Sequence, residues 1–83
     1  MTALAQEDER LTKQMDVFPQ RLQRLRERRQ KSRRVVSELC GLPADAVRRY
    51  ERAEARPNME ALVKLADYFE VSLDYLTGRA NYR

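Results

Sequence analysis

Residues 33–52 read RRVVSELCGLPADAVRRYER, a pattern of two short helices on either side of a glycine. Val36, Leu39 and Cys40 recur at the spacing of one buried helix face. Gly41 follows directly, and glycine ends helices readily because it adopts the left-handed backbone conformation without steric cost. The pattern predicts a helix, a tight turn and a second helix.

The second helix is predicted over residues 44–52, after a connection of about three residues. Ala46, Val47 and Tyr50 supply its inward positions at helical spacing. Ser37 in the preceding helix is small and lets the second helix approach closely. The two helices are therefore expected to pack directly against each other.

Three more helices are predicted around this pair, all from apolar residues at helical spacing. Their inward positions are Phe18, Leu22 and Leu25 in a helix that ends near Gln30, Leu62, Leu65, Ala66 and Phe69 in a helix that follows Asn58, and the LDYLT segment between Ser72 and Gly78. Ser32, Asn58 and Ser72 are placed to cap helices, because their side chains can accept a bond from a free backbone N–H. The chain has only two glycines and three prolines, and no stretch of alternating β-branched residues competes with the helices. The sequence thus predicts an all-α, compact five-helix bundle.

The predicted domain spans residues 18–79 and contains the two-helix unit 33–52. Residues 1–17 are expected to form an N-terminal extension, an arm that is disordered or partly helical, and residues 80–83 a tail. In a chain of 83 residues folding hides only about 60% of the unfolded surface, so a large buried active-site cavity is not expected.

The positive charge is concentrated in the middle of the chain. The net charge is +4, and residues 21–56 hold twelve arginines and lysines against five acids, while the segments on both sides are slightly acidic. A central cationic face of this kind indicates a polyanionic partner.

Several classes of protein are excluded by the residues that the chain lacks. Cys40 is the single cysteine and there is no histidine, which rules out a disulfide framework, a zinc site of cysteine and histidine ligands and histidine-dependent catalysis. Without a phosphate loop or a metal-binding cluster, no enzyme, no metal and no cofactor are expected, and Cys40 is predicted to be a core thiol. The apolar stretches are far shorter than the roughly 20 residues that span a bilayer, so no membrane contact is expected and the predicted location is the cytoplasm, at the nucleoid.

Three segments, in order and without gaps, resemble one known family. Its first helix is similar to RLQRLRERR, its second helix and turn to VSELCGLP, and the remainder to VRRYERAEARPNMEALVKLADYFEVSLDYLTG. This is the Cro and phage-repressor type of helix-turn-helix proteins, the XRE family of small transcriptional regulators, and the resemblance covers residues 18–79. It implies the fold of the phage-repressor DNA-binding domain and double-stranded DNA as the partner.

The resemblance also implies which residues meet the bases. The helix 44–52 would enter the major groove and read base edges with Ala44, Asp45, Arg48 and Arg49. Arg49 is the first choice, because a guanidinium can donate two bonds to the O6 and N7 edge of guanine, and Arg48 is expected closer to the DNA backbone. The alternative is that both arginines are simply solvated on an exposed helix face.

Asp45 has two interpretations. A carboxylate near phosphates is repelled unless it accepts a bond from a cytosine amino group. An acid in the first turn of a helix is also stabilised by the helix dipole, by about 0.3–1 kcal/mol, whatever the partner. Ala44 could offer only a methyl contact to thymine.

The remaining site residues have positioning or structural roles in the family. Ser32, Arg33, Arg52 and Arg56 match positions that contact DNA phosphates, and such contacts orient the protein without specifying sequence. The resemblance further implies a structural ion pair of Arg26 with Glu51, and places Tyr75 and Leu76 in a region that several members use for dimer contacts.

Two functions remain open at this point. The first is a sequence-specific DNA-binding transcriptional regulator, a repressor that acts as a homodimer on a palindromic operator. The alternative is an antitoxin-like or adaptor module whose main partner is another protein, with DNA binding secondary or lost. Residues 44–46, Ala-Asp-Ala, motivate the alternative because they offer few groups that read bases.

Overall fold

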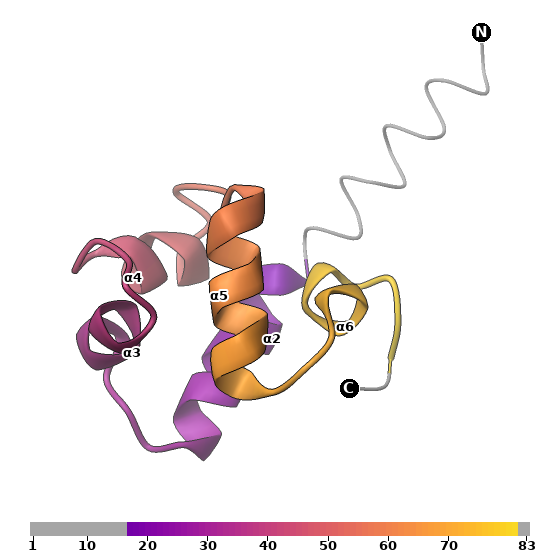
Figure 1. The fold of residues 1–83 in the computed structure, drawn as a ribbon, viewed down its shortest axis with the longest axis horizontal. Coiled ribbons are helices and arrows are strands. Elements are labelled where there is room, and N and C mark those ends of the chain that lie inside the picture. Colours follow the sequence, from indigo (N-terminus) through magenta and orange to yellow (C-terminus); the bar gives the residue numbers. More distant parts are fainter. Residues whose placement is uncertain (1–16, 82–83) are drawn as a thin grey trace, which may run out of the picture.

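The computed structural model describes residues 17–81, and all regular structure within them is helical (Figure 1). The helices are α2 (Phe18–Arg28), α3 (Arg33–Leu39), α4 (Ala46–Glu51), α5 (Met59–Phe69) and α6 (Leu73–Thr77). The all-α, five-helix fold predicted from the sequence is confirmed for these residues. Except for residue 17, the predicted N-terminal arm lies outside the described residues, as do residues 82 and 83 of the predicted tail.

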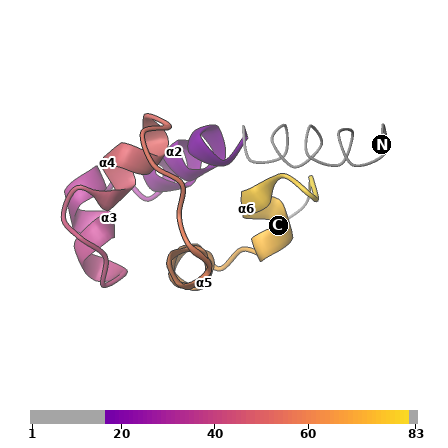
Figure 2. The same ribbon diagram turned by 90° about the horizontal axis from the view of Figure 1, so that it is seen from above.

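Helix α2 joins the two ends of the bundle. α3 and α4 lie together at one end, α6 lies at the other, and α5 stands between them (Figure 1 and Figure 2). α2 packs against both α4 and α6, and α5 packs against α6. The largest fully buried apolar side chains come from all five helices: Phe18, Leu22, Val36, Val47, Leu65 and Leu76. Because one core holds every helix, α4 is fixed from its inner side and its outer side stays exposed.

The predicted helix caps are confirmed. The side-chain oxygens of Ser32, Asn58 and Ser72 each accept the backbone N–H of the residue three positions on, at 3.1, 2.8 and 3.0 Å. Gly41 and Gly78 follow α3 and α6 with φ angles of +72° and +89°, the left-handed conformation expected where these helices end.

Leu39 corrects the predicted inner face of α3. Its side chain is 59% exposed, whereas Val36, Ser37 and Cys40 are buried. Val36, Ser37 and Cys40 lie on the face of α3 that packs into the core. Leu39 lies at the edge of that face and is therefore largely exposed. Cys40 is a core thiol as predicted, and burial raises its pKa, although the nearby Lys64 ammonium acts in the opposite direction.

The predicted start of α4 is also corrected. The helix begins at Ala46, two residues later than expected, because Ala44 and Asp45 form a turn in which the Ala46 N–H donates to the Pro43 carbonyl at 2.9 Å. Two of the predicted base-reading residues therefore lie in the turn that leads into the helix. At the other end of α4, Arg52 is the C-cap.

Arg21 holds the C-terminal end of the domain against α2. Its guanidinium donates to the backbone carbonyls of Tyr75 and Ala80, the latter at 2.7 Å, and to Asn81 Oδ1 at 3.3 Å. The same guanidinium lies 4.4 Å from the centre of the Tyr75 ring, a cation–π contact. This role of Arg21 is not visible in the sequence, because its carbonyl partners become neighbours only when α6 packs on α2.

Candidate nucleic-acid interface

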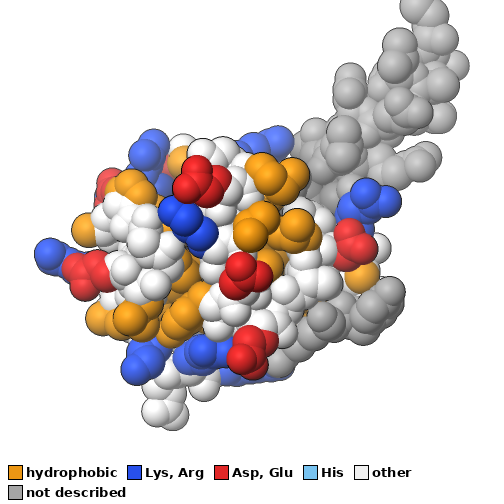
Figure 3. All heavy atoms as spheres, in the orientation of Figure 1, with side chains coloured by type: hydrophobic (Ala, Val, Ile, Leu, Met, Phe, Trp, Pro, Cys, Tyr) orange, Lys and Arg blue, Asp and Glu red, His pale blue; other side chains and the backbone are white. Residues whose placement is uncertain are grey.

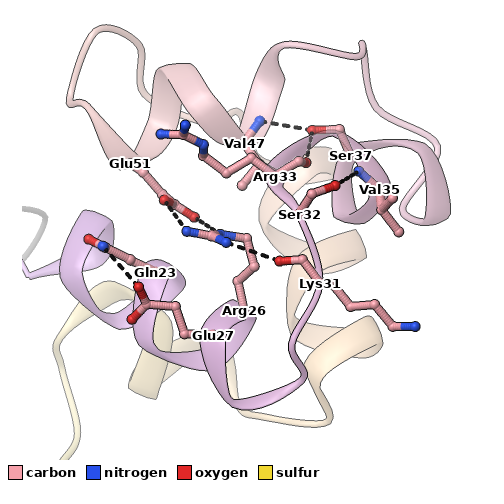
Figure 4. Close-up of polar contacts among 10 residues, drawn as sticks. All are labelled: Gln23, Arg26, Glu27, Lys31, Ser32, Arg33, Val35, Ser37, Val47 and Glu51. Carbon is pink, nitrogen blue, oxygen red and sulfur yellow. Dashed lines mark hydrogen bonds and ion pairs between the residues drawn. The ribbon is translucent and has the colours of Figure 1, made fainter.

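A buried serine hydroxyl fixes α4 against α3. The Ser37 side chain is fully buried, and its Oγ donates to the Arg33 carbonyl and accepts the Val47 N–H, both at 3.0 Å (Figure 4). The sequence predicted only that a small residue was needed here. The hydroxyl adds a directional contact, because it satisfies a backbone N–H in the first turn of α4 that otherwise lacks a helical partner.

Replacing Ser37 with alanine is expected to lower the free energy of unfolding by about 1–3 kcal/mol, because the Val47 N–H would be left buried without an acceptor. Urea denaturation measures this loss. Hydrogen exchange at the Val47 amide should also become faster than in the parent protein. Unchanged stability together with unchanged exchange would show that the contact does not hold α4.

An ion pair ties α4 to α2. Arg26 Nε lies 2.6 Å from Glu51 Oε2, and Arg26 Nη2 lies 3.1 Å from Glu51 Oε1, so the two groups are joined by two parallel bonds (Figure 4). Arg26 Nη1 also donates to the Lys31 carbonyl at 3.0 Å, in the loop that leads to α3. The bond to Glu51 raises the pKa of the Arg26 guanidinium, although burial acts against it. The Arg26–Glu51 pair implied by the family resemblance is thus present, and it connects three segments around the two-helix unit.

A shallow cleft brings together residues from the starts of α3 and α4. It is lined by Ser32, Arg33, Arg34, Ala44, Asp45 and Arg48. Two of the predicted phosphate-contacting residues therefore face three of the predicted base-reading residues. Arg49 does not line this cleft but is exposed further along α4.

A second cleft lies beside the end of α4. Its lining includes Pro19 and Gln20 from the start of α2, and Arg52 and Arg56 from the loop after α4. The four predicted phosphate-contacting residues thus form two pairs, one at each end of α4.

The arginines of the two clefts differ in how strongly they are paired. Arg52 Nε lies 2.9 Å from Glu54 Oε2, and Arg34 Nε lies 3.1 Å from Glu38 Oε1. Four arginines that are predicted to contact DNA have exposed side chains and form no ion pair within residues 17–81: Arg33, Arg48 and Arg56 in the clefts, and Arg49 further along α4. These four positive charges are available to an anionic partner without breaking an internal contact.

Tyr75 and Leu76 are not placed to make the dimer contact expected of them. Both belong to the core, where Leu76 is fully buried and Tyr75 is 6% exposed. The sequence pattern could not separate inward positions of α6 from positions that meet a partner, since both are apolar. The exposed large apolar side chains of α5 and α6 are Met59, Val63 and Leu73.

No group of three or more potential metal-ligating side chains occurs among the described residues. None of the helices in that part of the chain is both long and apolar enough to cross a membrane.

Known proteins similar to this chain are transcriptional regulators. A family model of helix-turn-helix proteins matches residues 22–76. The cryptic phage CTXphi transcriptional repressor RstR of Vibrio cholerae is 37% identical over 60 residues, which are 72% of this chain and 54% of the repressor. The HTH-type transcriptional regulator AnsR of Bacillus subtilis is 37% identical over 59 residues, 71% of this chain and 51% of the regulator. The chain thus spans about half the length of the curated relatives it matches.

Among solved structures, the chain is similar to the P22 c2 repressor in complex with a synthetic operator. The TM-score is 0.67 at 27% sequence identity, and the match covers 71% of this chain and 89% of the repressor chain. The two-helix unit 33–52 and all residues that line the first cleft lie within the range of the family match.

Proposed function

Because this chain belongs to the helix-turn-helix family, in its Cro and phage-repressor (XRE) branch, we propose that it is a sequence-specific DNA-binding transcriptional regulator, a repressor that binds a palindromic operator as a homodimer. The observation that carries the proposal is the exposed outer side of α4, with unpaired arginines along it and a cleft at each end. Such a protein would act in the cytoplasm, at the nucleoid.

In this proposal α4 lies in the major groove and the turn before it faces the bases. Arg49 is exposed and would donate two bonds to guanine, while Arg48, in the cleft with Arg33, would lie nearer the phosphates. Ala44 is exposed in the turn and could contribute a methyl contact to thymine. No cofactor is needed for any of these contacts.

Phosphates would be held at both ends of α4. Ser32 and Arg33 would bind one DNA strand at the first cleft, and Arg52 and Arg56 would bind the other backbone at the second cleft. Each side chain is long or exposed enough to follow a phosphate without moving the helices. These contacts fix the register of α4 on the duplex.

Salt dependence tests this arrangement. Arg33, Arg48, Arg52 and Arg56 of each protomer are expected near phosphates, which gives about eight cationic contacts in a dimer. The logarithm of affinity should then fall with the logarithm of salt with a slope of roughly −7. Fluorescence anisotropy of a labelled duplex between low and physiological salt measures the slope. Binding that does not depend on salt would contradict the proposed phosphate contacts.

The homodimer would use the exposed apolar side chains of α5 and α6. Met59 is 67% exposed, Val63 lies one turn further along α5, and Leu73 begins α6. Hydrophobic side chains gather beside α5 on its side toward α6, between charged groups (Figure 3). A two-fold axis through this patch would place the same residues of two copies against each other. The half-sites would then lie about 10 base pairs apart, or a multiple of that.

Replacing Val63 with glutamate is expected to shift the protein toward monomers and to weaken operator binding, because a charge would be buried between the two copies. Analytical ultracentrifugation with and without operator DNA measures the assembly state. Val35→Glu is the matched control, because Val35 is 38% exposed on α3 and Val63 is 39% exposed on α5. If both variants dimerise like the parent protein, the contact between copies lies elsewhere.

One observation favours the alternative, an antitoxin-like or adaptor protein. Val35 and Leu39 form an exposed apolar pair one turn apart on α3, a surface that suits a protein partner. Charge reversal separates the two functions. Arg49→Glu together with Arg52→Glu should abolish DNA binding if the chain is an operator-binding regulator, and should leave a protein partner bound if it is an adaptor.

A further inference from the structure

The Asp45 carboxylate forms no contact that stabilises the start of α4. Asp45 occupies the N-cap position of α4, but its side chain accepts no capping bond. The side chain is exposed and, within residues 17–81, takes part in no hydrogen bond or ion pair. This holds although Arg33, Arg34 and Arg48 line the same cleft.

Ser37 of α3 accepts one of the N–H groups at the start of α4 that a capping side chain could otherwise accept. A capping aspartate normally accepts the N–H of the second or third residue of its helix. In α4 the second residue is Val47, and its N–H already donates to Ser37 Oγ at 3.0 Å. The N–H of Ala46 donates to the Pro43 carbonyl at 2.9 Å. Asp45 therefore makes no side-chain capping bond, and its stabilisation by the helix dipole, which needs no such bond, remains the alternative to a base contact.

In the proposed operator complex, Asp45 would face the bases together with Arg49. Asp45 and Arg49 lie one turn apart, since the Arg49 N–H donates to the Asp45 carbonyl at 3.0 Å, and residues at this spacing share one face of a helix. A negative charge among the arginines of this face weakens phosphate binding. On DNA, the repulsion between this carboxylate and the phosphates is offset only where a base donates a hydrogen bond to the carboxylate.

We propose that Asp45 selects a cytosine in each half-site of the operator. Cytosine presents only its N4 amino donor in the major groove, whereas guanine and thymine present acceptors and adenine places the N7 acceptor beside its donor. A carboxylate, which only accepts, is repelled by the guanine and thymine edges, and at adenine the N7 acceptor offsets the bond from the N6 amino group. Arg49, one turn away, would donate to the acceptors of a guanine, and Asp45 would accept from the amino donor of a cytosine. This inference rests on the proposed operator binding.

The test compares the sequences selected from a randomised duplex pool by the parent protein and by three variants. The parent should enrich cytosine at one position of each half-site. Asp45→Asn keeps a side chain suited to the N-cap position and should change that preference to adenine, which an amide recognises through N6 and N7, while Asp45→Ala should lose the preference. Glu54→Gln is the matched control, because Glu54 pairs with Arg52 outside the base-reading face. It should raise the affinity for all sequences and leave the selected sequence unchanged.

A modified operator then tests the bond itself. Replacing the selected cytosine of one half-site with a pyrimidine that lacks the N4 amino group should weaken binding of the parent protein roughly 10- to 100-fold and leave the affinity of Asp45→Ala unchanged. If the parent selects an operator but the Asp45 variants select the same one, or change their affinity equally for every sequence, the cytosine contact is refuted while the operator function stands. If the parent selects no sequence at all, the proposed function itself fails.

Discussion

Replacing Glu51 with alanine is expected to lower the free energy of unfolding by about 3–5 kcal/mol, because it leaves the Arg26 guanidinium without its acid in a largely buried place. The side chains of Arg26 and Glu51 are only 15% and 4% exposed. Urea denaturation at neutral pH measures the loss. DNA binding should weaken in parallel, since the pair holds α4 against α2 and the loop at Lys31.

Two further variants distinguish the stability effect of the buried Arg26–Glu51 pair from that of an exposed ion pair. Replacing both partners with apolar residues, Arg26→Met with Glu51→Leu, should restore most of the lost stability because no unpaired charge remains. Arg34→Ala breaks the exposed pair with Glu38, whose side chains are 77% and 57% exposed, and should cost less than about 0.5 kcal/mol. A loss for Glu51→Ala as small as that for Arg34→Ala would contradict the structural role of the buried pair.

Replacing Arg49 with alanine is expected to weaken operator binding roughly 25-fold or more, because the homodimer loses one bidentate contact to guanine in each half-site and each contact is worth roughly 5- to 150-fold. Its side chain is exposed and forms no ion pair within the described residues, so the fold should not be affected. Fluorescence anisotropy with the operator and with a scrambled duplex, at one salt concentration, measures the change. The discrimination between the two duplexes should fall by the same factor as operator binding.

Arg48 and Arg24 provide the controls for this result. Arg48→Ala should weaken binding to both duplexes equally, because Arg48 lies in the cleft with Arg33 and is expected to contact phosphate. Arg24 is exposed on α2 and lines neither cleft, so Arg24→Ala should have little effect. If Arg49→Ala also weakens both duplexes equally, Arg49 is a phosphate contact and another residue reads the guanine.

Much of this fold could be predicted because its signals are local. Ser32, Asn58 and Ser72 cap helices through bonds to residues three positions on, and glycine has a left-handed conformation where a helix must end. Apolar spacing located the helices because each has one buried side. Such features depend on neighbours in the sequence, so the sequence contains nearly all the information needed.

The features that could not be predicted depend on contacts between distant segments. The Ser37 hydroxyl meets Val47 only when α4 packs on α3, and Arg21 finds its carbonyl partners only when α6 packs on α2. Leu39 has the spacing of a core residue but lies at the edge of the buried face, which the packing of α3 determines. For the same reason a buried residue such as Leu76 could not be distinguished from a dimer contact.

Asp45 shows how the structure narrows a question that the sequence leaves open. The sequence permits both a helix-end role and a base contact, because both need an acid at the start of the same helix. The carboxylate accepts no capping bond, and the Ser37 hydroxyl accepts the Val47 N–H, one of the two donors that a capping side chain could reach.

Selection of bound duplexes from a randomised pool, with the purified protein at physiological salt, is the most direct test of sequence-specific operator binding. Operator binding by a homodimer predicts an enriched palindrome whose half-sites are about 10 base pairs apart or a multiple of that. Binding without any enriched sequence, or no binding at all, would contradict a sequence-specific regulator.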